Sequence, residues 1–369
     1  MAGLRASLLL LLFCLGACSD SGQSTIANKQ AQLSESASPW QTVACSLDIP
    51  DGYVASCGTL KRDYFSLPVL IISKQDAQVS TEPLLYLAGG PGGSGSARGE
   101  YAEYWFDWYE TAGLDGDLVI VDQRGTGASE PHIDCPAYWN FSRDILRRDI
   151  AMDKELQQGQ EVLRRCFAEG AAVDAFNPRD YGTALSAEDM MVLMKALEYP
   201  RWNVFGVSYG SRLALALWDM DRGQHIEKIV LDSIYPLGKG SLEEWPAMLE
   251  VAIDRVFHDC VGSECSKDIG NIRWQQFWLA IERLRQQPMS MSISSWYGEA
   301  PQKFILNDQR FVSLLFNLLY DRYTIEQIPD LLAAVVAGDV DNIEGPVWYE
   351  GALYYSNMGS HQADKNGLN

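Results

Sequence analysis

Histidine is scarce in this sequence, and the cysteine spacing that is typical of zinc sites is absent. Four histidines occur among 369 residues, and no two cysteines form a Cys-x-x-Cys pair. A structural zinc site needs several Cys or His ligands, usually in such closely spaced pairs. The glycine-rich segment 89–95 also lacks the Gly-Lys-Ser/Thr ending of a P-loop and the glycine spacing of a dinucleotide fingerprint. We therefore expect neither a metal nor a cofactor.

Positive charge is also scarce. The chain has 29 Lys and Arg against 49 Asp and Glu, which gives a formal net charge of −20. Nucleic acids and anionic lipid surfaces attract basic proteins, so this balance argues against nucleic acid as a partner and against electrostatic binding to anionic lipid. Hydrophobic residues make up 47% of the chain, which is enough for the core of one large domain or two smaller ones.

Residues 1–17 have the pattern of an export signal. A positive residue, Arg5, precedes a short apolar run at 8–13 that cannot span a bilayer. Leu-Gly-Ala-Cys, ending at Cys18, resembles a bacterial lipobox, a signal that is cut before a cysteine that is then acylated. Ser19 after it is typical of sorting to the outer membrane. An ordinary signal peptide with an incidental cysteine is the alternative. We expect an exported protein, lipid-anchored to the bacterial outer membrane and facing the periplasm.

The cysteines that remain after the signal and Cys18 form an even set. In an exported chain such a set predicts disulfide bonds, although the sequence does not determine the pairing. We choose local pairing, because each pair then lies within one segment between core elements. The expected pairs are Cys45–Cys57, Cys135–Cys166 and Cys260–Cys265.

The sequence is organised around Gly-Val-Ser-Tyr-Gly at 206–210, which matches the Gly-x-Ser-x-Gly nucleophile elbow. Residues 202–205 read as a short buried strand, and residues 211–220 read as a helix with one apolar face. The tight turn between them would place the serine at a helix N-terminus, where N–H groups and the helix dipole stabilise an oxyanion. Ser208 is therefore the candidate nucleophile, and a chance match within a loop is the alternative.

Buried strands alternate with helices over much of the chain. Apolar runs at 83–88, 117–121 and 226–231 suit the interior of a parallel sheet, whereas 45–75 reads as antiparallel strands. The strand pattern stops after Pro236. Helices are expected at 242–258, 272–286, 308–320 and 325–337. Such helices would form a cap above the site.

The glycine-rich segment 89–95 directly follows one of the buried strands. In a chain that also holds a nucleophile elbow, we interpret it as an oxyanion-hole loop, because glycines let backbone N–H groups approach a substrate carbonyl. A purely structural turn is the alternative.

Several motifs together resemble the proline iminopeptidase and tripeptidyl aminopeptidase family of α/β-hydrolases, including its exported members. They are GGPGGSG at 89–95, DQRGTGAS at 122–129, YGT at 181–183 with Asp189, GVSYGSRLA at 206–214 and LDSIYP at 231–236. The resemblance implies an α/β-hydrolase fold, with a parallel-rich sheet and a helical cap. It also implies a serine exopeptidase that removes residues from peptide N-termini.

The resemblance assigns roles to particular residues. It makes Ser208 the nucleophile and the N–H groups of Tyr209 and Gly90 the oxyanion hole, with Asp122 and Arg124 bracing the loop beside the site. Together with the export signal, it leads us to divide the chain into a signal peptide at 1–17, a lipid-anchored linker at 18–40, a hydrolase core at 41–236 and a helical cap at 237–369, which is incomplete at its C-terminus.

The resemblance breaks toward the C-terminus. In α/β-hydrolases the acid and then the His follow the nucleophile, and the family carries both on strands after the cap. The sequence reaches Asn369 without such a strand, so we expect these last strands to be absent. Asp232, which follows a strand, is the candidate acid, although its place in this family looks structural. His361, in a polar tail, is the candidate base. The histidines that do not fit are His132, His225 and His258.

Alternative functions follow from this break. The first is an exported, membrane-anchored serine aminopeptidase that cleaves peptides with a free N-terminus through an acyl-enzyme. The second is a non-catalytic homologue that binds peptides or another ligand in the same pocket, and an exported esterase is a further alternative. A serine without a positioned base is a weak nucleophile, so we expect low activity from this chain. Carboxylates that could bind a free amine are Glu243, Glu244 and Glu350.

Overall fold

The computed structural model of the protein describes residues 38–76, 82–131, 135–174, 177–240, 243–259, 268–293 and 301–343. The predicted features that lie outside these residues are the export signal, Cys18, Cys260, Cys265, His132, His361 and Glu350. None of the described helices is long and apolar enough to cross a membrane.

A seven-stranded sheet forms the centre of the protein, in the order β1-β2-β3-β5-β4-β6-β7. The antiparallel strands are β1 (Trp40–Val43), β2 (Tyr53–Arg62) and β3 (Phe65–Lys74). The mutually parallel strands are β4 (Leu84–Leu87), β5 (Leu118–Val121), β6 (Trp202–Val207) and β7 (Ile226–Asp232). Every residue of β5 is buried, as expected for a parallel strand that is covered on both faces. The predicted α/β class with a parallel-rich sheet is therefore confirmed.

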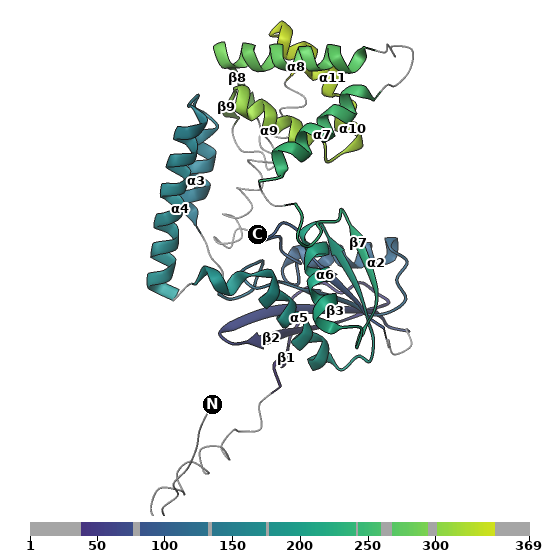
Figure 1. The fold of residues 1–369 in the computed structure, drawn as a ribbon. Coiled ribbons are helices and arrows are strands. Elements are labelled where there is room, and N and C mark those ends of the chain that lie inside the picture. The colour runs from purple at the N-terminus through teal and green to yellow at the C-terminus, as the bar shows by residue number, and fades with distance from the viewer. Residues whose placement is uncertain are drawn as a thin grey trace, which may run out of the picture.

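Alternation along β5 sends side chains into two different cores. Val121 packs with α5 (Thr183–Leu197) and α6 (Tyr209–Asp221) on one face of the sheet. Ile120 packs with α2 (Tyr104–Thr111) on the other face. Short 3-10 helices, η1 (Glu100–Glu103) and η2 (Pro178–Tyr181), precede α2 and α5. The helices between the strands thus cover both faces of the sheet (Figure 1).

Strand β7 is the outermost of the parallel strands in the described sheet. Its side chains are mostly exposed, and Val230 has 56% of its surface accessible. An apolar edge strand is a template for pairing with another chain. β7 is therefore an exposed edge of the sheet in the described part of the chain.

The region after β7 is mainly helical, as predicted. Its helices are α7 (Trp245–His258), α8 (Ile269–Gln286), α9 (Asp308–Leu318), α10 (Arg322–Ile325) and α11 (Ile328–Ala337). The prediction that strands stop after Pro236 was wrong, because β8 (Met289–Ile293) and β9 (Gln302–Leu306) form a hairpin there. The side chains of β8 alternate between buried and exposed, the period of a half-buried strand. We call the unit from α7 to α11 the cap.

Two helices between β5 and α5, α3 (Pro136–Ile145) and α4 (Met152–Asp174), pack against each other beside the cap (Figure 1). We call this pair the arm. Its connecting segment packs into the cap, where Ile145 and Leu146 join the same buried cluster as α8, α9 and α11. The arm and the cap therefore share one hydrophobic core, although they are far apart in the sequence.

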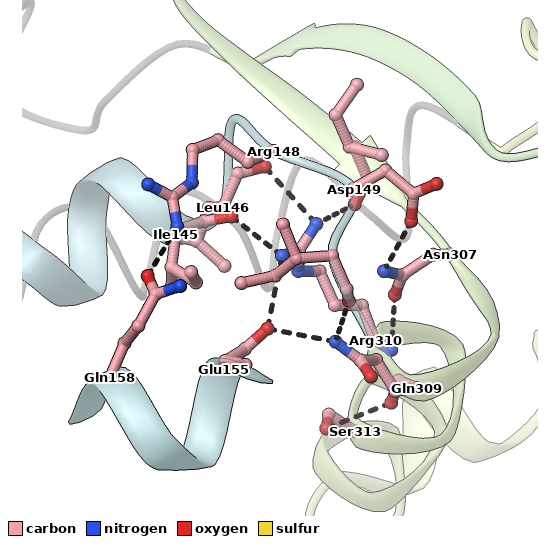
Figure 2. A network of polar contacts seen from close by, with 12 residues as sticks. Ile145, Leu146, Arg148, Asp149, Glu155, Gln158, Asn307, Gln309, Arg310 and Ser313 are labelled. Atoms are coloured by element: carbon pink, nitrogen blue, oxygen red, sulfur yellow. Dashed lines mark hydrogen bonds and ion pairs between the residues drawn. The ribbon is translucent and has the colours of Figure 1, made fainter. Parts of the chain in front are cut away.

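A polar network also joins the arm to the cap (Figure 2). Arg310, at the start of α9, donates hydrogen bonds to the carbonyl oxygens of Ile145 and Ile305, both at 2.7 Å. The side chain of Asn307 donates to Asp149 at 3.1 Å. Arg310 is 7% exposed, so its bonds lie in a region of low dielectric, where they are stronger than in water.

Two of the predicted disulfides are formed. One joins Cys45 to Cys57 of β2, and the other joins Cys135 at the start of α3 to Cys166 of α4. The first fixes the segment after β1 to the sheet, and the second fixes the two helices of the arm to each other. The expected pair Cys260–Cys265 lies outside the described residues.

Candidate active site

Ser208 occupies a strained turn between β6 and α6. Its backbone dihedrals, φ 53° and ψ −119°, are costly for a residue with a side chain. The flanking glycines make this turn possible. A Cβ atom on Gly206 would lie 2.3 Å from the carbonyl oxygen of Gly210, and one on Gly210 would lie 2.0 Å from that of Leu87. The predicted strand–turn–helix elbow is therefore present, with the half-buried Ser208 at its tip.

The glycine-rich loop passes directly beside this serine. A Cβ atom on Gly89 would lie 3.6 Å from Ser208 Oγ. Gly90, with a φ of 111°, lines the same cleft as Ser208. Tyr209 is the first residue of α6, and the first N–H groups of a helix have no partner within the helix. The two predicted oxyanion donors thus both lie near the candidate nucleophile: Tyr209 follows Ser208 in the chain, and Gly90 lines the same cleft.

Buried side chains fix the glycine-rich loop in place. The carboxylate of Asp122 accepts hydrogen bonds from the hydroxyl of Ser94 at 2.8 Å and from the N–H of Ala128 at 2.9 Å. Burial raises the pKa of Asp122, and the hydrogen bonds it accepts oppose that rise. The indole N–H of Trp105 donates to the carbonyl oxygen of Gly95 at 2.9 Å. Asp122 therefore links the loop to the 122–129 segment, in the bracing position that the resemblance implied.

Gln123 holds the start of the same loop. Its side-chain amide donates to the carbonyl oxygen of Ala88 at 3.0 Å, and Gln123 is 5% exposed. The residue after Ala88 is Gly89, which adjoins the nucleophile. Gln123 lies within the 122–129 motif, but this role is not visible in the sequence, because its partner is a backbone oxygen that no pattern reveals.

Arg124 braces a different part of the site. Its guanidinium forms two hydrogen bonds to the buried carboxylate of Asp189 on α5, both at 2.7 Å. Arg62 on β2 donates to the same carboxylate at 2.9 Å. Arg124 also lies over the ring of Phe65, with 4.7 Å between the guanidinium carbon and the ring centroid. This cluster ties β2, the 122–129 segment and α5 together behind the elbow.

The candidate acid Asp232 ends β7 next to the elbow. Its carbonyl oxygen accepts the N–H of Ser208 at 2.9 Å, and its exposed carboxylate accepts the hydroxyl of Ser233 at 2.9 Å. The structure therefore gives its backbone a role in positioning the nucleophile.

Neither described histidine lines the cleft that contains Ser208. His225 immediately precedes β7, at the opposite end of the parallel strands from Ser208, and its ring contacts Asp221 at 2.8 Å. His258 ends α7 and pairs with Asp254 at 3.2 Å. The described residues thus supply no histidine base at the nucleophile, and the candidate His361 lies outside them.

A cleft of about 920 Å³ opens above Ser208, between the elbow and the cap. Its lining is mostly apolar and comes from α7, α9 and the loop after β7. The large apolar and aromatic side chains that line it include Ile234, Trp245, Met248, Val251, Phe316, Leu319 and Tyr320. Three charged residues, Lys239, Glu244 and Arg255, also line it. Its volume is within the range of small-molecule and peptide sites, roughly 300–1,000 Å³.

The loop after β7 is held against the elbow helix. Arg212 on α6 donates to the carbonyl oxygens of Pro236 at 3.0 Å and Lys239 at 3.2 Å. The hydroxyl of Ser211 accepts the N–H of Tyr235 at 2.8 Å. All of these residues except Lys239 fall in the motifs at 206–214 and 231–236, and in the structure they shape one wall of the cleft. The apolar residues on α7 and α9 had no such signal, because their facing arrangement depends on how the cap packs.

Comparison with known proteins agrees with this geometry. Residues 82–258 match the family model described as the alpha/beta hydrolase fold. The sheet order, the elbow and this match together define an α/β-hydrolase fold, as the sequence predicted.

The curated relatives are peptidases. The chain is 26% identical over 205 residues to a tripeptidyl aminopeptidase of Streptomyces lividans, covering 53% of this chain and 38% of that protein. It is 26% identical over 170 residues to a proline iminopeptidase of Arabidopsis thaliana, covering 46% of this chain and 31% of that protein. The resemblance to this family is thereby confirmed. The chain spans less than two-fifths of the length of these relatives.

Solved structures with a similar fold include a proline iminopeptidase of Mycobacterium smegmatis. It is 17% identical with a TM-score of 0.33, over 62% of this chain and 53% of that chain. A cold-adapted esterase from an Arctic intertidal metagenomic library is 18% identical with a TM-score of 0.31, over 56% of this chain and 70% of that chain.

Proposed function

We propose that the protein is a serine hydrolase that removes residues from the N-termini of peptides. The observation that carries this proposal is the strained Ser208 at the floor of the cleft, flanked by Gly90 and Tyr209. Peptidase relatives at 26% identity support the substrate class. Ser208 Oγ attacks the scissile carbonyl carbon and loses its proton to a base. The N–H groups of Gly90 and Tyr209 stabilise the resulting oxyanion.

The rest of the reaction follows from this attack. Collapse of the tetrahedral intermediate breaks the C–N bond, and the leaving amine takes the proton that the base received. Water then hydrolyses the ester on Ser208 and releases the N-terminal fragment. His361 remains our candidate base and Asp232 our candidate acid.

A free N-terminus requires a negative group in the cleft. Of the carboxylates considered, Glu244 lines the cleft, Glu243 is not among the lining residues and Glu350 is outside the described residues. Glu244 accepts the N–H of Gly240 at 2.6 Å, which fixes it at the start of α7. We therefore propose Glu244 as the partner of the substrate amine.

Location is part of the same proposal. The protein would be exported, acylated on Cys18 and held on the outer membrane facing the periplasm. The lipobox-like sequence supports the anchor, and the two disulfides suit an oxidising compartment.

The decisive experiment compares alanyl and prolyl anilides with their N-acetylated counterparts as substrates. An aminopeptidase hydrolyses the free amines and not the acetylated forms, and Ser208→Ala abolishes turnover. Equal turnover of both forms would indicate an esterase-like or amidase-like enzyme and would overturn the proposal.

A non-catalytic peptide-binding protein is the second candidate. It is favoured by one observation, that neither described histidine lines the cleft. In that case peptides bind equally well to the protein and to Ser208→Ala, and no substrate is turned over by either.

A further inference from the structure

Helix α7 forms a wall of the cleft with opposite charges at its two ends. Glu244 is the residue before the helix, and Arg255 lies in its last turn. Both line the cleft. Between them, Met248, Val251 and Ala252 also line it, and their spacing of three and four residues places them on one helical face. The wall therefore runs from an anion, along an apolar strip, to a cation.

The length of this wall sets a scale for the ligand. Eleven positions separate Glu244 from Arg255, which corresponds to about 16 Å at about 1.5 Å per helical residue. An extended peptide advances roughly 3.3–3.6 Å per residue. A peptide of about four or five residues would therefore span from one charged end to the other.

Arg255 is available for a ligand. Within the described ranges its guanidinium has no hydrogen bond or ion pair, although acidic residues outnumber basic ones in the chain, 49 to 29. The adjacent carboxylate of Asp254 is engaged by the indole N–H of Trp274 at 2.9 Å and by His258 at 3.2 Å. Arg255 is exposed to solvent. An exposed guanidinium without an acidic partner can bind a carboxylate through two parallel hydrogen bonds.

Lys239 is a second cation on the cleft, at the other end of the wall. Its carbonyl oxygen accepts a hydrogen bond from Arg212, and the next residue, Gly240, donates to Glu244. The backbone of Lys239 is therefore fixed beside Glu244, near the end of α7 that is opposite to Arg255. Lys239 offers a matched comparison, because its removal changes the charge of the cleft by the same amount without touching the far end.

We propose that Arg255 binds the C-terminal carboxylate of a short peptide whose N-terminal end lies toward Glu244. The substrates are then oligopeptides of about four or five residues and not intact proteins. This inference rests on the proposed function for the choice of a peptide substrate, but the carboxylate site requires only that the peptide binds. It can therefore be tested without turnover.

The test measures binding to the Ser208→Ala protein by isothermal titration calorimetry. The ligands are Ala-Ala-Ala-Ala, its C-terminal amide, and Ala-Ala-Ala-Glu amide. The free acid is expected to bind about tenfold more tightly than the amide, since a charge-assisted hydrogen bond contributes about 1.5–3 kcal/mol. When Arg255→Met is combined with Ser208→Ala, we expect the preference for the free acid to be lost. When Lys239→Met is combined with Ser208→Ala, we expect most of this preference to remain. Circular dichroism confirms that each variant is folded.

The outcomes separate the two proposals. Equal binding of acid and amide, or a preference that survives Arg255→Met, overturns the carboxylate site. Tight binding of the glutamyl amide alone would show that Arg255 recognises an acidic side chain and would also overturn the assignment to the C-terminus. If the carboxylate preference is found and no peptide is turned over by the Ser208 protein, the hydrolase proposal fails while the binding site stands.

Discussion

The guanidinium of Arg212 stacks on the ring of Tyr235, with 4.6 Å between the guanidinium carbon and the ring centroid. Arg212 belongs to the helix that follows the nucleophile, and Tyr235 belongs to the loop that forms a wall of the cleft. The hydroxyl of Tyr235 in turn donates to the carbonyl oxygen of Gly240 at 2.7 Å. Through this contact the element that presents the candidate nucleophile also sets the shape of the cleft.

Arg212→Met is therefore expected to weaken substrate binding more than catalysis. The methionine keeps part of the volume over Tyr235 but cannot donate to the carbonyl oxygens of Pro236 and Lys239. We expect KM to rise about tenfold or more, since each lost charge-assisted bond is worth about 1.5–3 kcal/mol, with kcat changed much less. Steady-state kinetics measure the split. The control is Arg201→Met, which removes a surface ion pair with Glu227; a similar rise in KM there would contradict the interpretation.

Ser208→Ala is expected to abolish covalent labelling by a fluorophosphonate probe. The probe reports an activated serine, and the elbow presents Ser208 beside the proposed oxyanion donors. Labelling is followed by gel fluorescence and intact mass. The control is Ser313→Ala, which removes an exposed hydroxyl on α9 that donates to the carbonyl oxygen of Gln309 at 3.3 Å. A label that persists in the Ser208 variant would place the nucleophile elsewhere.

Gln123→Met should slow the chemical step while leaving substrate affinity nearly unchanged. The methionine has a similar volume but cannot donate to the Ala88 carbonyl oxygen. The Ala88–Gly89 peptide bond, which precedes Gly90, therefore loses its fixed orientation. We expect kcat to fall about ten- to a hundredfold, toward the cost of removing an oxyanion donor. Exposed Gln224 provides the matched control, as Gln224→Met. An unchanged kcat with a rise in KM would show that Gln123 supports the cleft and not the oxyanion loop.

Asp189→Asn is expected to destabilise the protein strongly. Asp189 is fully buried and is shared by Arg124 and Arg62. Breaking a buried pair leaves an uncompensated charge and costs about 3–5 kcal/mol, which we expect as a lower midpoint in urea unfolding. Glu227→Gln, which breaks the exposed pair with Arg201, is the control and should change the midpoint little. Equal midpoints for the two variants would show that the buried pair is not stabilising.

Cys18→Ser should prevent acylation. The variant is expected to remain unprocessed or to be released into the periplasm, as judged by fractionation and by mass of the mature N-terminus. The control is Cys14→Ser, which lies within the signal and should leave processing intact. A processed Cys18→Ser protein that still fractionates with the outer membrane would mean that the anchor is elsewhere.

The elbow could be predicted from the sequence because its requirements are local. Gly206 and Gly210 leave no room for a side chain in the tight turn, and the serine between them follows a recognisable strand. The parallel strands were predictable for the same reason, since burial on both faces produces a continuous apolar run such as the one in β5.

The cap could be predicted only in part. Its helices have an apolar period, but the hairpin of β8 and β9 is short and resembles loop sequence. The role of Arg310 in joining the cap to the arm could not be predicted, because its partner there is the backbone oxygen of Ile145, 165 positions earlier in the chain. Likewise, the sequence does not show that Glu244 and Arg255 line one cleft with Ser208, because this depends on how the cap packs over the sheet.

The shared core of arm and cap has a consequence for folding. Strands β1 to β7 and helices α2, α5 and α6 have all been synthesised once Asp232 has emerged, so these strands can pair early during synthesis. The arm emerges in the middle of that stretch, yet its partner Arg310 lies 165 positions beyond Ile145. Contacts this distant in sequence are slow to form. The arm's apolar connection therefore stays exposed until α9 arrives, and that interval is when a chaperone would have the most to bind.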